Sequence, residues 1–435
     1  MAGTHETDTQ TGAESTESLP VVETGERHAL GRQSLPSLWH NREFTIVLLG
    51  QGVSAFGDAV NVTALPLLVV LLTGSGTQMG VVGVLQTVPH LVLGLPAGAL
   101  ADRWDRRKVM LGCDLGRALL TALIPVSFWA GVPTMPVVYA VTAPIGALTV
   151  LFLAAYTAVV PALVGRRQLG QANSYFQALA SMGFVLGPGI AGVLVGWIGP
   201  GPTLALDALT FAVSATTLGL IRRPLRAEAA PRGGSLWREV GAGLAYIWHN
   251  RVLRASIAFW SFVSVAIAPI VPVLTYYVTQ DLRLSASSLG IVISGWGGGS
   301  LLGSLLAARV TRGRLGLMML CGNVATGTLI FLHAFLSSVP AMAAATAGIG
   351  IMDAVVLVSY LTLRSSTTPD SLLGRVSSSA RMLSFGLAPV GMLVGGVLLD
   401  AIGGARTLML IGAVVVLISP LFAFSGSLRE ARGEG

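Results

Sequence analysis

Stretches of about twenty apolar residues recur along this chain, and they constrain its fold more than any other feature. The hydrocarbon core of a bilayer is roughly 30 Å thick and leaves backbone polar groups without water, so helices of about 20 apolar residues cross it. With 53% hydrophobic residues, 11% charged residues and a mean hydropathy of +0.74, the 435-residue chain does not have a soluble composition. We therefore expect an all-α membrane protein.

Twelve apolar runs are long enough to cross a membrane. In chain order they are Phe44–Leu72, Met79–Ala101, Val109–Ala130, Val137–Val164, Ser174–Ile198, Thr203–Ile221, Val252–Thr279, Leu289–Val310, Leu315–Ser337, Ala341–Leu363, Val376–Ile402 and Thr407–Phe424. A long polar stretch after the sixth run divides them into six plus six. The predicted organisation is a disordered cytoplasmic tail at 1–42, a six-helix bundle at 43–221, a central cytoplasmic loop at 222–251, a second bundle at 252–426 and a cytoplasmic tail at 427–435.

Basic residues are distributed unequally between the two sides of these helices. One side holds both tails, the central loop and the loops after even-numbered helices, and it carries 24 of the 27 Lys and Arg, that is, 27 less Arg117, Arg283 and Arg406. Cytoplasmic loops carry such an excess, so both termini are predicted to be cytoplasmic in a bacterial cell membrane. The net charge of +7 is then explained by the basic residues of these cytoplasmic loops. We therefore expect no nucleic-acid partner.

The most specific string is GALADRWDRRK, from Gly98 to Lys108, between the second and third predicted helices. It resembles the loop signature of the major facilitator superfamily. Asp105 stands where that signature has a glycine, a departure that resembles the branch of enterobactin exporters and macrolide-efflux proteins. The matching residues are Gly98, Asp102, Arg103, Arg106 and Arg107.

This resemblance extends over nearly all of Phe44–Phe424 and implies the fold of that family, with two pseudo-symmetric six-helix bundles. GVLVGWIG from Gly192 is similar to GVLLDAIG from Gly396 at the same place in each half. In the family the loop is a conformational gate, where the residue matching Asp102 meets the other half near helix eleven and favours the outward-open state. The alternative is a basic loop that only fixes topology.

A second string, GFVLGPGIAG, lies in the fifth predicted helix and resembles the antiporter motif of exporters in the same family. Small residues allow close helix packing, and a proline removes a backbone donor and bends the helix. Ordinary glycine-rich packing is the alternative. The motif positions are Gly183, Gly187, Pro188 and Gly192.

Ionisable residues inside membrane helices are costly and mark functional sites. Asp58 and Asp353 lie about 14 and 12 residues into their helices, near the membrane midplane. We expect Asp58 to couple transport to protons and Asp353 to be a second coupling site or a site for a substrate charge, with a structural capping role as the alternative for both. Asp114 and Arg117 are spaced to form a charge pair on one helix face. Asp207 and Asp400 are expected to have packing or interfacial roles.

A bulky amphipathic solute suits aromatic and amide groups inside a bundle. In this family helices one, four, seven and ten line the cavity. The candidate residues for the substrate cavity are Phe56, Gln86, Tyr156, Trp260, Tyr276 and Tyr360.

These patterns together predict a secondary transporter that exports an antibiotic, a siderophore or another natural product by proton antiport and alternating access. A proton-coupled importer and a transport-inactive sensor remain open alternatives. We expect no enzymatic activity, because Lys108 lacks the glycine pattern of a phosphate loop and no metal or nucleophile cluster occurs. The expected partners are a small-molecule substrate, protons and lipid; we expect a monomer without cofactor or metal.

Overall fold

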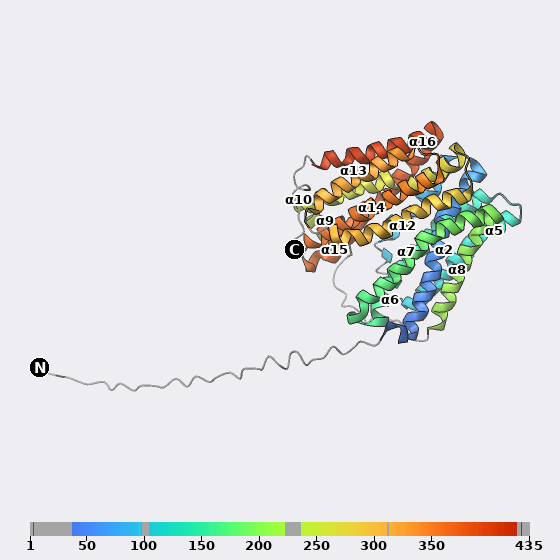
Figure 1. The fold of residues 1–435 in the computed structure, drawn as a ribbon. Coiled ribbons are helices and arrows are strands. Elements are labelled where there is room, and N and C mark those ends of the chain that lie inside the picture. Colours follow the sequence, from blue (N-terminus) through green and yellow to red (C-terminus); the bar gives the residue numbers. More distant parts are fainter. Residues whose placement is uncertain are drawn as a thin grey trace. The chain divides into compact units, whose positions relative to one another are not determined.

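The computed structural model describes residues 37–94, 96–97, 104–221, 236–310 and 313–423, together with Gly3 and Leu428. Of the predicted tail at 1–42 and the central loop at 222–251, large parts lie outside these residues. The described residues from Leu38 onward belong to one compact unit. Every element described in it is a helix (Figure 1).

The first half of the chain contributes six long helices and two short 3-10 turns. They are η1 (Leu38–His40), α2 (Arg42–Thr73), α3 (Gly76–Leu93), α5 (Arg106–Trp129), α6 (Thr134–Val164), η2 (Arg166–Gln168), α7 (Leu169–Ile198) and α8 (Pro200–Leu220).

The second half begins with a helix that the sequence placed in a loop. Its elements are α9 (Leu236–His249), α10 (Arg251–Ile267), α11 (Ile270–Tyr276), a π-helical turn η3 (Tyr277–Asp281), α12 (Ala286–Val310), α13 (Leu315–His333), α14 (Val339–Ser366), α15 (Asp370–Gly386) and α16 (Ala388–Ala423).

Ten described helical segments are long and apolar enough to cross a membrane, so the prediction of an all-helical, multi-pass membrane protein is confirmed. One of these segments, Ser371–Ala423, has 53 residues, about twice the length that one crossing needs. Gly403, at φ 80°, interrupts α16 and separates its two halves. The segment therefore corresponds to the last two predicted helices.

Local chemistry explains where the helices begin and bend. Asn41 caps α2, because its side-chain oxygen accepts a hydrogen bond from the backbone N–H of Phe44 at 3.1 Å. Gly74 ends the same helix in the left-handed conformation at φ 63°. Pro269 lies at the break between α10 and α11, where the sequence predicted one continuous helix, since proline lacks the N–H that the ladder requires.

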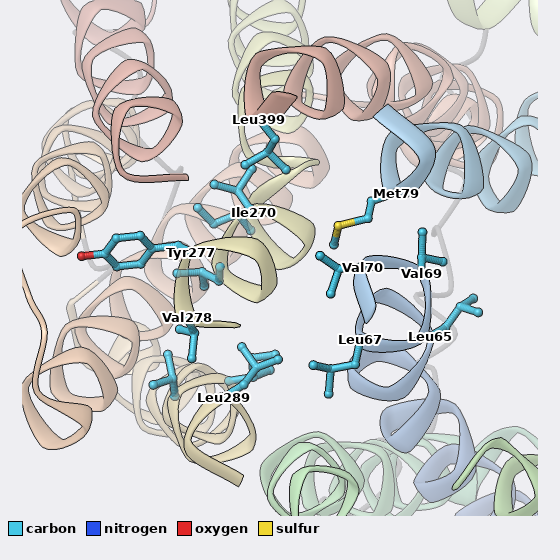
Figure 2. Packing of buried hydrophobic residues seen from close by; sticks show 14 of the residues in the cluster. Leu65, Leu67, Val69, Val70, Met79, Ile270, Tyr277, Val278, Leu289 and Leu399 are labelled. Carbon is cyan, nitrogen blue, oxygen red and sulfur yellow. The ribbon is translucent and has the colours of Figure 1, made fainter. Parts of the chain in front are cut away.

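The largest buried cluster joins the two halves of the chain (Figure 2). Leu67 and Val70 of α2 and Met79 of α3 share this cluster with Ile270 of α11 and Leu399 of α16. Its side chains are almost fully buried in a protein whose outer surface faces lipid. The two halves are thus held together by packing of apolar side chains.

Glycines bring α3 and α16 into close contact. A methyl group built on Gly396 would lie 2.5 Å from the carbonyl oxygen of Gly76 and 3.0 Å from the Cα of Gly80. No side chain larger than hydrogen fits there without a shift of backbone. The contact runs along Gly76–Gly83, the end of α3 that the charge distribution predicts to be extracellular.

Asp400 strengthens this contact at the beginning of α3. Its carboxylate accepts hydrogen bonds from the backbone N–H groups of Gly76 and Thr77, at 2.6 and 2.9 Å, and from the hydroxyl of Ser75 at 2.9 Å. A carboxylate at a helix N-terminus also interacts favourably with the helix dipole. Asp400 thus caps a helix of the other half, a more specific contact than the interfacial role that the sequence suggested.

Candidate functional site

Asp58 lies in the middle of α2, in a segment that two neighbouring helices hold tightly. A methyl group on Gly57 would lie 2.8 Å from Oδ1 of Asp207 on α8. On the other side, a methyl group on Gly187 of α7 would lie 2.6 Å from the Cβ of Ala59. The Asp58 side chain itself is exposed. The first predicted proton site is therefore flanked closely by α7 and α8.

Asp207 is an acidic neighbour of Asp58, and its exposed fraction is only 1%. Oδ2 accepts a hydrogen bond from Nδ2 of Asn61 at 2.6 Å. Oδ1 has no hydrogen-bond partner among the described residues. Asp207 also interacts electrostatically with Asp58 and Arg117. A packing role, as expected from the sequence, leaves this buried and half-satisfied carboxyl group unexplained.

Asp114 and Arg117 form an ion pair on α5, and both are almost fully buried. The guanidinium carbon of Arg117 lies 4.4 Å from the ring centre of Phe152 and 4.3 Å from that of Phe211, so the cation is held between two aromatic rings. The second oxygen of Asp114 accepts a hydrogen bond from Ser214 at 2.6 Å. The pair thus links α5 to α6 and α8.

A cavity of about 210 Å³ lies where the two halves meet, beside this cluster. Two amide side chains, Asn61 of α2 and Gln86 of α3, are its polar groups, and none of the described residues that line it is charged. The remaining lining residues are apolar or small: Val62, Leu65, Pro66, Val69, Met79, Val82, Gly83, Ala268, Val271, Pro272 and Met392.

Of the six residues predicted for the substrate cavity, Gln86 lines this one. Tyr156 packs instead against Phe152 and Phe176, with ring centres 6.1 and 5.3 Å apart. Trp260 and Tyr360 stack on each other at 5.2 Å in the second half, almost parallel at 9°. Phe56 and Tyr276 are half-buried on α2 and α11. The lining helices are α2, α3, α11 and α16, and Ala268 contributes from the turn between α10 and α11. The family pattern included the fourth and tenth membrane helices instead.

Asp353, the second predicted proton site, lies apart from the acidic cluster on α14. Its side chain is half-buried and makes no hydrogen bond among the described residues. The first half instead provides three neighbouring acidic residues, Asp58, Asp114 and Asp207, which we call the acidic cluster. The structure therefore gathers three of the intramembrane carboxyl groups in the first half and leaves Asp353 apart from them in the second.

Part of the predicted gating loop, including Gly98, Asp102 and Arg103, lies outside the described residues. Arg106 and Arg107 form the first turn of α5, which Asp105 caps by accepting from the backbone N–H of Arg107 at 3.0 Å. Arg107 donates to the carbonyl oxygens of Leu218 and Gly219, at 3.0 and 2.7 Å. It thereby satisfies the end of α8.

The small residues of the predicted antiporter motif face two different helices. Gly183 and Gly187 pack against α2, whereas Gly192 packs against α12 of the second half. A methyl group on Gly192 would lie 2.5 Å from the carbonyl oxygen of Ala286. Pro188 is buried within α7 between these positions. The motif therefore places α7 between the Asp58 segment and the other half of the chain.

Sequence reasoning missed Asn61 and gave Asp207 only a packing or interfacial role. Asn61 had a usable signal, because it follows Asp58 by three residues and so lies on the same helix face. Asp207 had the signal of an ionisable residue inside a predicted span, but only the packing of α8 on α2 shows which residues its carboxyl group meets. No group of three or more metal-ligating side chains occurs in the part of the chain that the structure describes.

Comparison with known sequences gives matches over almost the whole chain. Residues 47–272 and 256–434 match the sequence profile of the Major Facilitator Superfamily. The multidrug efflux pump Tap of Mycolicibacterium fortuitum is 30% identical over 397 residues, covering 88% of this chain and 96% of Tap. Macrolide efflux protein A of Streptococcus pyogenes is 24% identical over 398 residues, covering 89% and 97%.

Solved structures share the arrangement of helices at low sequence identity. The nucleoside transporter NupG superposes with a TM-score of 0.72 at 15% identity, covering 88% of this chain and 98% of NupG. A bacterial homologue of the human lysosomal transporter Spinster, in an inward-facing and unoccupied conformation, gives 0.69 at 14%, covering 90% and 98%. At such identities the likeness concerns the fold alone.

Proposed function

The chain belongs to the Major Facilitator Superfamily, and from that premise we propose that it exports a small amphipathic molecule from the cell in exchange for protons. The observation that carries the proposal is the cavity between the halves, with apolar walls and two amide groups. Pockets of this kind bind ligands that are mostly apolar with a few hydrogen-bonding groups. Similarity to a multidrug efflux pump and a macrolide efflux protein supports export.

The acidic cluster supports protons as the coupling ion. Asp58 is exposed within a membrane helix and lies close to Asp114, Arg117 and Asp207. Charged residues at such depth in a membrane protein are characteristic of proton pathways. We assign the first exchange of protons to Asp58 on this ground.

Import of a substrate is the second candidate, because NupG shares the fold. A transport-inactive sensor would also have this fold, and the acidic cluster argues against it, since buried charges are costly to retain without a function. The direction of transport therefore distinguishes the two active candidates, and the presence of coupling distinguishes both from a sensor.

Transport in everted membrane vesicles tests this proposal. Respiration acidifies the vesicle lumen, and an added substrate of a proton antiporter should then make the lumen more alkaline, with erythromycin and tetracycline as the first compounds to try. We expect Asp58→Asn to abolish this response while the protein remains folded in the membrane. Glu43→Gln, in the first turn of the same helix, is the matched control.

Two results would contradict the proposal. One is substrate accumulation in whole cells without a lumenal response in vesicles, which would favour import. The other is full proton-coupled transport in Asp58→Asn, which would remove Asp58 from the coupling site. Amounts of folded protein are compared by size-exclusion chromatography in detergent, so that loss of the protein is not mistaken for loss of coupling.

A further inference from the structure

One side chain belongs both to the cavity and to the acidic cluster. Asn61 lines the cavity, and its Nδ2 donates to Oδ2 of Asp207 at 2.6 Å. Gln86, the other amide in the cavity, makes no side-chain hydrogen bond to an acidic residue among the described residues. Asn61 is therefore the direct link between the place where a ligand fits and a buried carboxyl group.

We propose that Asp207 is a second proton-carrying residue and that Asn61 signals to it whether the cavity is occupied. This inference rests on the proposed function, because it explains how a ligand and a proton would exclude one another. The proposed exporter would then have two proton-coupling residues, Asp58 on α2 and Asp207 on α8.

The geometry of the Asn61 amide explains the exchange. An amide presents an N–H₂ donor and a carbonyl acceptor, and rotation by half a turn interchanges them. Toward a carboxylate it must present the donor, as it does here, whereas a protonated carboxyl group can donate its own hydrogen to the carbonyl. The orientation of the Asn61 amide thus depends on whether Asp207 is protonated. Conversely, an amide held in one orientation favours one protonation state of Asp207.

A ligand can fix this orientation from the cavity side. If a hydroxyl or ammonium group of the ligand donates to the Asn61 carbonyl oxygen, the amide N–H₂ remains directed at Asp207. The O–H bond of a protonated Asp207 then breaks, the electron pair stays on its carboxylate, and the proton passes to the neighbouring carboxylate of Asp58, to which we assigned the first exchange of protons. Proton release on ligand binding is the step that antiport requires.

The surroundings of Asp207 suit a group that changes its charge. Oδ1 has no hydrogen-bond partner among the described residues, although the side chain is almost fully buried. It lies against Gly57 of α2, and the charged groups that face it are Asp58 of α2 and the Arg117 of α5. An oxygen left unsatisfied in this way is costly for a permanent carboxylate, so it suits one that is protonated for part of the cycle.

Infrared spectroscopy tests the assignment without a ligand. The full chain is purified, reconstituted in lipid and titrated from acid to alkaline pH, while the absorption of protonated carboxyl groups is recorded. We expect one protonated-carboxyl band to be missing in Asp207→Asn and its midpoint to shift by about one pH unit in Asn61→Leu, the effect of one lost hydrogen bond to a charged group. Gln86→Leu, at the other cavity amide, should leave that midpoint in place.

An unchanged carboxyl spectrum in Asp207→Asn would overturn the proposal, as would equal midpoints in Asn61→Leu and wild type. Asp207→Glu keeps a titratable group and should retain a band if the asparagine variant fails to fold. If only the vesicle experiment fails, the proposed export is refuted, whereas the infrared result for Asp207 and Asn61 still holds. If the variants do not change the infrared titration while antiport is intact, the roles of Asp207 and Asn61 are refuted but the proposed export is not.

Discussion

At the scale of single residues, the most constrained charge is the guanidinium group of Arg117. It pairs with Asp114, lies between the rings of Phe152 and Phe211, and is 2% exposed. Burying two charges costs several kcal/mol for each, which the pairing and the aromatic faces offset only while both partners are present. Removal of one partner is therefore worse than removal of both.

We predict that Arg117→Leu destabilises the protein by about 3 to 5 kcal/mol, because Asp114 is left as an unpaired buried charge. The double variant Asp114→Asn/Arg117→Leu should recover part of this loss. Lysine should not replace the arginine fully, since it cannot stack as a flat group between two rings. Thermal unfolding of the purified variants in detergent measures their order of stability. A double variant less stable than Arg117→Leu would contradict this account.

At the scale of helices, α7 connects the acidic cluster with the other half of the chain. Its face at Gly183 and Gly187 packs on the α2 segment that carries Asp58, and its face at Gly192 packs on the first turn of α12. Because both contacts bring the helix backbones close together, a shift of α12 is passed to α2 through α7.

We predict that Gly192→Leu destabilises the α7–α12 contact by about 1 to 3 kcal/mol through overpacking. Gly196→Ala, one turn further along α7, is the matched control, because a methyl group there would lie 3.5 Å from the Ser287 hydroxyl, an ordinary contact. Unfolding temperature and the transport rate should fall in the first variant and not in the second. Equal effects in both variants would show that the close approach at Gly192 is unimportant.

The helices themselves were predictable, since the requirement for about twenty apolar residues marks each span in the sequence. Their interruptions were less so. Pro269 breaks a predicted continuous helix, and the central loop contains α9, because these outcomes depend on packing between helices. The same limit applies to the site: Asp58 was found from its depth in the membrane, whereas Asp207 acquires its meaning only from the helix it faces.

At the scale of the whole molecule, the two halves meet along α3 with α16 and α7 with α12. The residues in close contact, such as Gly76 with Leu399 and Gly192 with Ala286, lie toward the helix ends that the charge distribution predicts to be extracellular. Asp400 of α16 caps α3 at the same end. We interpret this arrangement as a protein closed toward the outside.

We predict that Asp400→Ala moves the population toward an outward-open state, because the beginning of α3 loses three hydrogen bonds from the other half. Spin labels at Val132, in the predicted outer loop between the third and fourth helices, and at Phe335, between α13 and α14, should then give longer distances in pulsed electron resonance. Asp281→Ala is the control: its carboxylate accepts from the backbone N–H of Ala405 at 3.0 Å within one half. An identical distance distribution in Asp400→Ala and wild type would refute the closing role.

The cavity wall and the acidic cluster have one residue in common, Asn61. Natural variation can therefore alter the apolar wall, at Val62, Leu65 or Met392 for instance, without touching the groups that carry charge. Under the proposed proton-coupled export, such changes would alter which compounds fit while the use of the proton gradient stays intact. The proposal thus predicts that variants exporting a new compound arise among the wall residues and only rarely at Asn61.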